Sequence, residues 1–285
     1  MTRSIRIVLV TLLVLAGLVA AARQVLYVRT QRAGFEPPPP GHERPSDLAL
    51  RFDSLSIGSG ERTLDAWWIP AEGADSGAVL LFHGNAETID EWLAAARLLH
   101  GHHLDVMLFD YSGYGRSTGQ PSVNAAIEDG VSALRAFERR VPRGVRRTGA
   151  GLSLGCAVLM ESAVRYPGAL DGVALMEPFS SGRDAAVQLK LLPGWAALLM
   201  PDAFDNVRLA RALRVPLLVV HSTGDRKFPV EFARRIADAA VVPKRLVVLD
   251  GFEHADARRR PSEAYWGPVV EFAQGTPGVP GSTGR

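Results

Sequence analysis

Short runs of apolar residues alternate with stretches of helical periodicity along most of this chain, and this alternation limits its fold more than any other feature. The apolar runs lie at residues 78–82, 105–109, 146–152, 173–176, 215–220 and 245–249. Helical patterns follow most of them, at residues 88–100, 123–139, 155–166, 231–240 and 262–272. Continuous apolar strands separated by helices are typical of a parallel sheet covered on both faces. Residues 48–52 and 63–69 predict a hairpin ahead of this α/β unit.

The amino terminus carries a separate apolar run. Residues 7–22 are apolar except for Thr11 and follow a short basic stretch. One interpretation is a secretory signal peptide cleaved after the small residues 20–22. The favoured interpretation is an uncleaved anchor over residues 7–28, in which the long side chain of Arg23 reaches the interface. Both interpretations bring residues 1–30 to a membrane. The remainder is expected to be an extracytoplasmic domain held by the anchor or, after cleavage, a secreted or periplasmic protein.

Composition and breaker residues divide the remainder of the chain. Residues 31–46 contain four consecutive prolines, which predicts an extended linker, and the Gly- and Pro-rich residues 275–285 predict a flexible tail. The folded domain is therefore expected over residues 47–274. A net charge of +2 gives no reason to expect a nucleic-acid partner, and a single cysteine excludes an intramolecular disulfide or a thiolate-based metal cluster.

A glycine-flanked serine lies between an apolar strand and an apolar helix. The sequence Gly151-Leu152-Ser153-Leu154-Gly155 matches the G-x-S-x-G nucleophile elbow in its required context. The tight turn leaves no room for side chains at the flanking positions and presents the serine hydroxyl above the sheet. Ser153 is the predicted nucleophile.

A serine nucleophile requires a base and an acid that orients the base. Only His221 and His254 follow Ser153. His254 lies in the loop after the last predicted strand and is the predicted base, while His221 ends the preceding strand and is expected to support the next loop. Asp225, in that loop, is the predicted acid, and Glu177 is the second choice.

The tetrahedral intermediate of acyl transfer needs two N–H donors for its oxyanion. The first is expected from Leu154, the residue after the nucleophile. The second is expected from the loop after residues 78–82, where Asn85 is preferred and Ala86 is the alternative.

These motifs together resemble the α/β-hydrolase superfamily. The resemblance rests on the elbow, on residues 83–86 and 109–117, and on the loops that carry Asp225 and His254. It is nearest to the small membrane-anchored serine hydrolases that include acyl-protein thioesterases and lysophospholipases. It implies an eight-stranded, mostly parallel sheet, a Ser-His-Asp triad, and neither a metal nor an organic cofactor. Glu87 and Cys156 depart from the family pattern, where glycine is common, and Glu87 is expected to narrow or charge the mouth of the pocket.

Substrate chemistry is less constrained by the sequence. Residues 179–215 predict a short cap insertion whose apolar character suits either an acyl chain or packing on the domain. The expected activity is hydrolysis of carboxylic esters or thioesters on small acyl or lipid-like substrates. The alternatives are a peptidase or amidase with the same triad, and a catalytically silent binding module tethered to a membrane. Arg258, Arg259 and Arg260 are expected to form a solvated face, with anionic headgroups as the other option.

Overall fold

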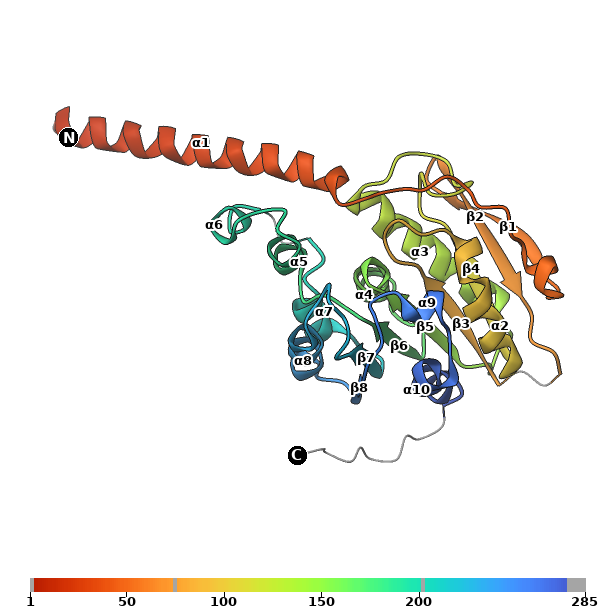
Figure 1. The fold of residues 1–285 in the computed structure, drawn as a ribbon. Helices are drawn as coiled ribbons and strands as arrows, with labels where there is room; N and C mark the ends of the chain where they lie inside the picture. Colours follow the sequence, from red (N-terminus) through yellow and green to blue (C-terminus); the bar gives the residue numbers. More distant parts are fainter. Residues whose placement is uncertain (1–2, 74–75, 201–202, 276–285) are drawn as a thin grey trace.

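The protein is built on one twisted sheet of eight strands, seen in a computed structural model that describes residues 3–73, 76–200 and 203–275 (Figure 1). The strand order is β1-β2-β4-β3-β5-β6-β7-β8. The strands are β1 Asp53–Ser59, β2 Arg62–Ile69, β3 Gly77–Phe82, β4 Leu104–Phe109, β5 Arg147–Leu152, β6 Gly172–Met176, β7 Leu217–Ser222 and β8 Lys244–Leu249. Strand β2 pairs antiparallel with β1 and β4, and every other pair is parallel. The predicted α/β-hydrolase fold class, with its mostly parallel eight-stranded sheet, is confirmed.

Helices cover both faces of this sheet, because its central strands are buried along their whole length. One face packs on α3 Val123–Arg140, α4 Leu154–Arg165 and α8 Val230–Ala239. The other packs on α2 Leu93–Gly101, α9 Asp256–Arg259 and α10 Glu263–Ala273. A 3₁₀ turn, η2 Ile89–Trp92, precedes α2. Each face of the sheet therefore has its own hydrophobic core, and the sheet separates the two cores.

The first strand was predicted in the wrong place. The sequence pattern favoured residues 48–52, but β1 is Asp53–Ser59 and a 3₁₀ turn, η1 Pro45–Leu48, precedes it. Proline at the start of that turn and Ala49 in the left-handed region (φ 58°) interrupt the extended chain there. Strand β1 pairs with β2 from Asp53↔Trp68 to Ser59↔Arg62, so the predicted leading hairpin exists with a shifted first strand.

The amino-terminal helix α1 runs over Arg3–Ala33 and projects away from the domain (Figure 1). Its first 24 residues, Arg3–Leu26, are apolar enough and long enough to cross a membrane, and none of them is buried against the domain. At 1.5 Å per residue they span about 36 Å, more than the hydrocarbon thickness of a bilayer.

Of the segment predicted as a linker over 31–46, residues 31–33 belong to α1 and residues 45–46 to η1, and residues 35–41, which are neither helix nor strand, contact the domain. Phe35 is buried in the core that contains α3 and α4, and the Glu36 N–H donates to Asn85 Oδ1 at 3.0 Å. Further along, the Gly115 N–H donates to the carbonyl of Pro38. The chain between α1 and the domain is therefore fixed at its start. Of the tail predicted over 275–285, residues 276–285 lie outside the described residues.

The predicted cap insertion forms three short helices, α5 Gly182–Gln188, α6 Gly194–Ala197 and α7 Asn206–Ala212. Helices α5 and α6 protrude on the side of the domain where α1 leaves it (Figure 1). Arg183 ties them together through Nε, which donates to the carbonyl of Met200 at 2.8 Å. The Phe179 ring at the base of the insertion packs on Phe228, with ring centroids 5.5 Å apart.

Replacing Gly155 with alanine is expected to lower the free energy of unfolding by about 3 kcal/mol, because the added methyl group meets backbone rather than a movable side chain. A Cβ at Gly155 would lie 2.0 Å from the carbonyl oxygen of Phe82. Gly267→Ala in α10 is the matched control, since a Cβ there meets nothing within 4 Å. That variant is expected to gain about 0.5–1 kcal/mol from helix propensity. Chemical denaturation of both variants measures the two changes, and equal stabilities would contradict the steric account.

Candidate active site

Ser153 occupies the turn between β5 and α4 in a conformation that few residues adopt. Its backbone has φ 54° and ψ −114°, and its N–H donates to the carbonyl of Met176 at 3.0 Å. A Cβ at Gly151 would come within 2.7 Å of the backbone of Gly155, which explains the flanking glycines. Cys156 lies fully buried behind the turn and its thiol donates to the carbonyls of Gly151 and Met176. The turn is thus held on both sides with the serine hydroxyl toward the carboxyl edge of the sheet.

The structure brings the three residues predicted for catalysis into one hydrogen-bonded chain. His254 Nε2 lies 2.9 Å from Ser153 Oγ, and His254 Nδ1 lies 2.7 Å from Asp225 Oδ2. Ser153 and His254 are 101 residues apart in the sequence, and each of the three follows a different strand. The Phe228 ring packs edge-on against the imidazole, with centroids 5.3 Å apart, and fixes its plane.

Asp225 is held as a carboxylate. Its side chain is buried, and burial alone raises the pKa of a carboxyl group. The hydrogen bond from His254, the electrostatic interaction with that ring, and the N–H groups of Phe228 and Lys227 outweigh this effect, so the pKa of Asp225 lies below its usual value. Its two oxygens are fully used: Oδ2 faces the imidazole and Oδ1 accepts from the loop backbone. A charged acid in this position orients an imidazole with its other nitrogen toward the serine.

Two buried groups lie beneath Asp225. His221 Nε2 is 3.1 Å from the carbonyl oxygen of Phe228 and 3.7 Å from Asp225 Oδ2, so its ring supports the loop as expected. Glu177, the second-choice acid, accepts from the Ser222 N–H and from the Tyr265 hydroxyl, and contacts His221 Nδ1 at 3.3 Å. Burial, together with the nearby Asp225 charge, raises the pKa of Glu177 well above its usual value. No hydrogen bond joins Glu177 to His254 among the described residues, and the structure therefore favours Asp225 as the partner of the imidazole.

Within the described part of the chain, Glu177, His221 and Asp225 are the one group of potential metal ligands that lie close together, with ligand atoms within 4.8 Å of one another. The carboxylate oxygens that would bind a cation already accept hydrogen bonds from backbone N–H groups, a tyrosine hydroxyl and His254. This donor set is therefore better described as the support of the acid loop than as a metal centre.

The loop that was predicted to supply an oxyanion donor is anchored through Asn85. Its Oδ1 accepts from the Tyr114 hydroxyl at 2.6 Å and from the Glu36 N–H at 3.0 Å. Leu154 is the first residue of α4, so its N–H has no acceptor within the helix. The role of Tyr114 was not anticipated, because no local pattern connects residues that are 29 positions apart.

Glu87 is oriented differently from what the sequence predicted. It is buried, and Oε2 accepts from the Gly84 N–H and from the indole N–H of Trp92. Arg258 Nε lies 3.2 Å from its other oxygen, and Arg258 Nη1 also binds Glu91 at 2.7 Å. Glu87 therefore braces the loop from behind instead of charging the mouth of a pocket. Arg258 is committed to these two carboxylates and is not part of a solvated basic face.

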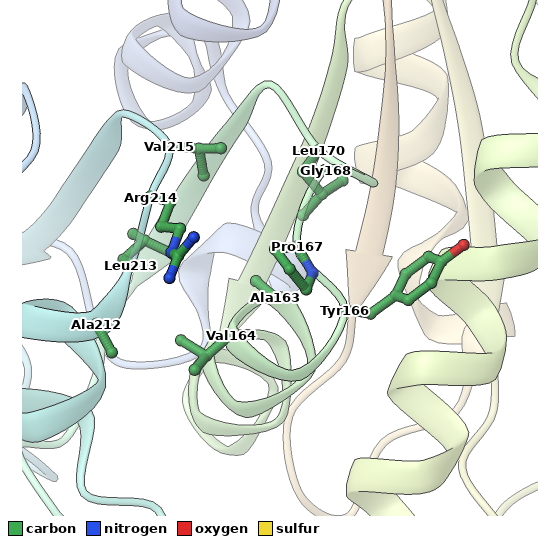
Figure 2. A pocket seen from close by; sticks show the side chains of 10 residues that line it. All are labelled: Ala163, Val164, Tyr166, Pro167, Gly168, Leu170, Ala212, Leu213, Arg214 and Val215. Atoms are coloured by element: carbon green, nitrogen blue, oxygen red, sulfur yellow. The ribbon is translucent and has the colours of Figure 1, made fainter.

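Two hollows in the surface lie at the end of the sheet opposite Ser153. A pocket of about 30 Å³ is lined by residues between Ala163 and Leu170 and by Ala212–Val215 (Figure 2). These residues precede β6 and β7, whereas Ser153 follows β5, so the pocket lies at the amino ends of parallel strands. A volume of this size accommodates about one water molecule. A second hollow, between Glu138 and Arg147, also lies before β5. Neither of these two pockets belongs to the candidate site.

Asp110, beside the anchored loop, is expected to make stability depend on pH. Burial raises its pKa to about 8, which the hydrogen bond from the Ile89 N–H only partly offsets. The folded state therefore binds a proton that the unfolded state releases near pH 4. This contribution is complete below the unfolded pKa and is lost as the pH rises through 8.

Replacing Asp110 with asparagine removes that titration. The difference in unfolding free energy between the native protein and Asp110→Asn is expected to change by about 1 kcal/mol per pH unit from pH 6.5 to 8, with the native protein losing stability. Titrations of groups that do not interact with Asp110 cancel in this difference. Urea denaturation at four pH values measures it, and parallel curves would show that Asp110 is ionised in the folded state.

An eight-stranded sheet with a serine at a strained strand-to-helix turn is typical of the α/β-hydrolase fold. A family model described as "Serine aminopeptidase, S33" (Hydrolase_4) matches residues 73–209. Among solved structures, the esterase Pf2001 of Pyrococcus furiosus superposes with a TM-score of 0.66 at 19% identity, covering 83% of this chain and 95% of that one. The chain has the α/β-hydrolase fold.

Its relatives include bacterial and human proteins. The uncharacterized protein Rv2307c of Mycobacterium tuberculosis is 34% identical over 196 residues, which are 68% of each chain, and the two belong to one family. The uncharacterized protein YfhR of Escherichia coli is 27% identical over 216 residues, covering 73% of this chain and 75% of YfhR. The human alpha/beta hydrolase domain-containing protein 17B is 27% identical over 183 residues, covering 62% and 60%.

Proposed function

We propose that this protein is a membrane-anchored serine hydrolase that cleaves carboxylic esters or thioesters through an acyl-enzyme on Ser153. The observation that carries the proposal is the continuous hydrogen-bonded chain from Ser153 Oγ through His254 to Asp225. A serine hydroxyl in contact with an imidazole that is oriented by a carboxylate is the arrangement that acyl transfer requires. The resemblance to acyl-protein thioesterases and lysophospholipases makes acyl and lipid-like esters the first substrates to test.

In the proposed reaction His254 Nε2 takes the proton of Ser153 Oγ as the oxygen attacks the carbonyl carbon. The negative charge that develops on the carbonyl oxygen is bound by the backbone N–H groups of Leu154 and Asn85. When the tetrahedral intermediate collapses, the ester or thioester bond breaks and His254 returns the proton to the leaving alcohol or thiol. A water molecule, activated by His254, then attacks the acyl-enzyme and releases the acid. Asp225 stays ionised throughout and stabilises the imidazolium.

Helix α1 is the proposed membrane anchor, with the catalytic domain on the extracytoplasmic side. None of its apolar first 24 residues is buried against the domain, and such exposure is unfavourable in water and favourable in lipid. Extraction of membranes at alkaline pH and sequencing of the mature amino terminus test this point separately from catalysis. A protein that begins after residue 22 and is released from the membrane would identify the segment as a signal peptide.

A peptidase is the second candidate, and it is favoured by the description of the matching family model, which names a serine aminopeptidase. An aminopeptidase needs an anionic group to hold the substrate ammonium. Glu87, which lies in the loop after β3, is already paired with Arg258 and bound by Gly84 and Trp92. Its commitment to these partners makes the esterase the better-supported proposal.

One panel of substrates separates the candidates. The detergent-solubilised full chain is offered p-nitrophenyl esters of increasing acyl length, an acyl thioester and aminoacyl anilides, with labelling by a fluorophosphonate probe alongside. The proposal expects turnover of esters or thioesters, a burst of one nitrophenol per site, and labelling of Ser153. Faster cleavage of the anilides identifies a peptidase. A folded protein that neither turns over nor reacts with the probe is a silent binding module.

A further inference from the structure

Apolar side chains are exposed together on the cap. Among the described residues from 34 to 275, seven large apolar side chains are exposed, and five of them lie between residues 187 and 198. These five residues form the cap patch: Val187, Leu189, Leu191, Trp195 and Leu198. Trp195 and Leu198 are each 72% exposed. Single exposed apolar residues are ordinary on a soluble protein, but five within one segment of twelve residues indicate a surface that something apolar covers.

The cap patch has a defined inner face. Ala196, Ala197 and Met200 are buried, while Trp195 and Leu198 are exposed on the same short stretch, where α6 packs on α5. The Arg183 guanidinium donates to the carbonyl of Met200 and thereby joins the first turn of α5 to the segment that follows α6. The segment that carries the exposed side chains of Trp195 and Leu198 is therefore held in place by its buried residues and by Arg183.

We infer that the cap patch lies in the interfacial layer of the lipid bilayer that α1 enters. This inference rests on the proposal that α1 is a membrane anchor. Helix α1 extends from the domain toward the side on which α5 and α6 protrude (Figure 1). A bilayer entered by α1 would therefore lie on the same side of the domain as the segment that carries the cap patch. Tryptophan with neighbouring leucines is the composition of segments that lie in a membrane interface.

The charges around the patch agree with a lipid partner. Residues 187–200 contain one lysine, Lys190, and no acidic residue. A lysine among exposed leucines extends its ammonium to lipid phosphates while its methylene chain stays in the apolar layer. A carboxylate in this stretch would oppose insertion next to anionic headgroups, and none is present in it.

Trp195 provides an internal reporter of this contact. The chain has five tryptophans, and the other four, Trp67, Trp68, Trp92 and Trp266, are at most 4% exposed. Helix α1 contains no tryptophan, so insertion of the anchor alone leaves the indole emission unchanged. The full chain is reconstituted into phosphatidylcholine vesicles that carry bromine on the acyl chains, a quencher that acts only at short range.

The inference expects acyl-chain bromine to quench a component of the emission that is absent from Trp195→Phe. Leu191→Asp combined with Leu198→Asp is expected to abolish that quenching, because two carboxylates are unfavourable in the apolar layer. Val241→Asp is the matched control, since Val241 is 76% exposed on the loop between α8 and β8, and its variant is expected to be quenched like the native protein. Thermal unfolding shows that each variant is folded.

Two results overturn the inference. In the first, the protein sediments with vesicles and yet Trp195 is not quenched, which means that α1 inserts while the patch stays in water. In the second, the patch is covered by a second copy of the chain, which sedimentation in detergent reveals as a dimer that Leu198→Asp dissociates. Failure to sediment with vesicles contradicts the anchor itself, and ester turnover, measured separately, reports on the proposed catalysis.

Discussion

Ser153→Ala is expected to lower kcat/KM for an activated ester by about 10⁴-fold or more, because the acyl-enzyme has no atom on which to form. The residual rate above that in buffer is expected from the proposed oxyanion donors, which the substitution leaves in place. The folded state is expected to be unaffected, since the serine side chain makes no capping hydrogen bond to α4. Initial rates and thermal unfolding of the same preparation measure both quantities.

Ser153→Gly is the informative companion of that variant. Both variants lack the hydroxyl, but glycine also removes the strain of a side chain at φ 54°. The glycine variant is expected to be as inactive as the alanine variant and more stable by about 1 kcal/mol. A stability gain with loss of activity locates the strain at the nucleophile itself. Turnover by either variant near the native rate would remove Ser153 from the mechanism.

Asp225→Asn is expected to lower kcat by about 10⁴-fold with little change in KM. The amide fits the same space, but it carries no charge to stabilise the imidazolium. It also presents a donor or an acceptor to His254 Nδ1, so the ring is no longer held with its Nε2 lone pair toward the serine. Steady-state kinetics near neutral pH measure the effect. A loss confined to KM would mean that Asp225 organises the loop without acting on the base.

Glu177→Gln is the control for that experiment, because it changes the neighbouring buried carboxyl group. The raised pKa of Glu177 keeps its side chain uncharged near neutral pH, and glutamine has the same length and charge. Its kcat is expected to stay within a few-fold of the native value. A loss as deep as that of the Asp225 variant would instead assign the role of the acid to Glu177, the alternative that the sequence left open.

The parts of the fold that repeat a simple pattern were predictable from the sequence. The central strands β3 to β6 begin within one residue of their predicted positions, because buried parallel strands are continuous apolar runs with clear ends. The chain order of Ser153, Asp225 and His254 was equally accessible, since each residue follows a strand and the carboxyl ends of parallel strands meet at one edge. The two hydrogen bonds between them needed coordinates, because rotamers decide those distances.

Contacts between distant segments were not predictable in the same way. Glu87 has the local surroundings of a residue at the mouth of a pocket, and only the position of Arg258 and Trp92 turns it inward. The prolines at 37–40 predicted a linker over residues 31–46, whereas α1 continues to Ala33 and η1 begins at Pro45. The prolines gave no indication that Phe35, just before them, would be buried in the core. The burial of a single aromatic residue depends on space left between other elements, so the periodicity of the surrounding sequence does not predict it.

With α1 in a bilayer, the way the chain enters the domain decides where the enzyme can work. Only Gly34 separates the end of α1 at Ala33 from Phe35, whose ring is inside the domain. One residue spans about 3.5 Å, so this connection allows the domain very little movement away from the end of α1. A domain that is attached in this way stays within the layer of water next to the bilayer and meets only molecules near the membrane surface. For the proposed esterase, the position of the domain at the membrane would then restrict which substrates reach Ser153.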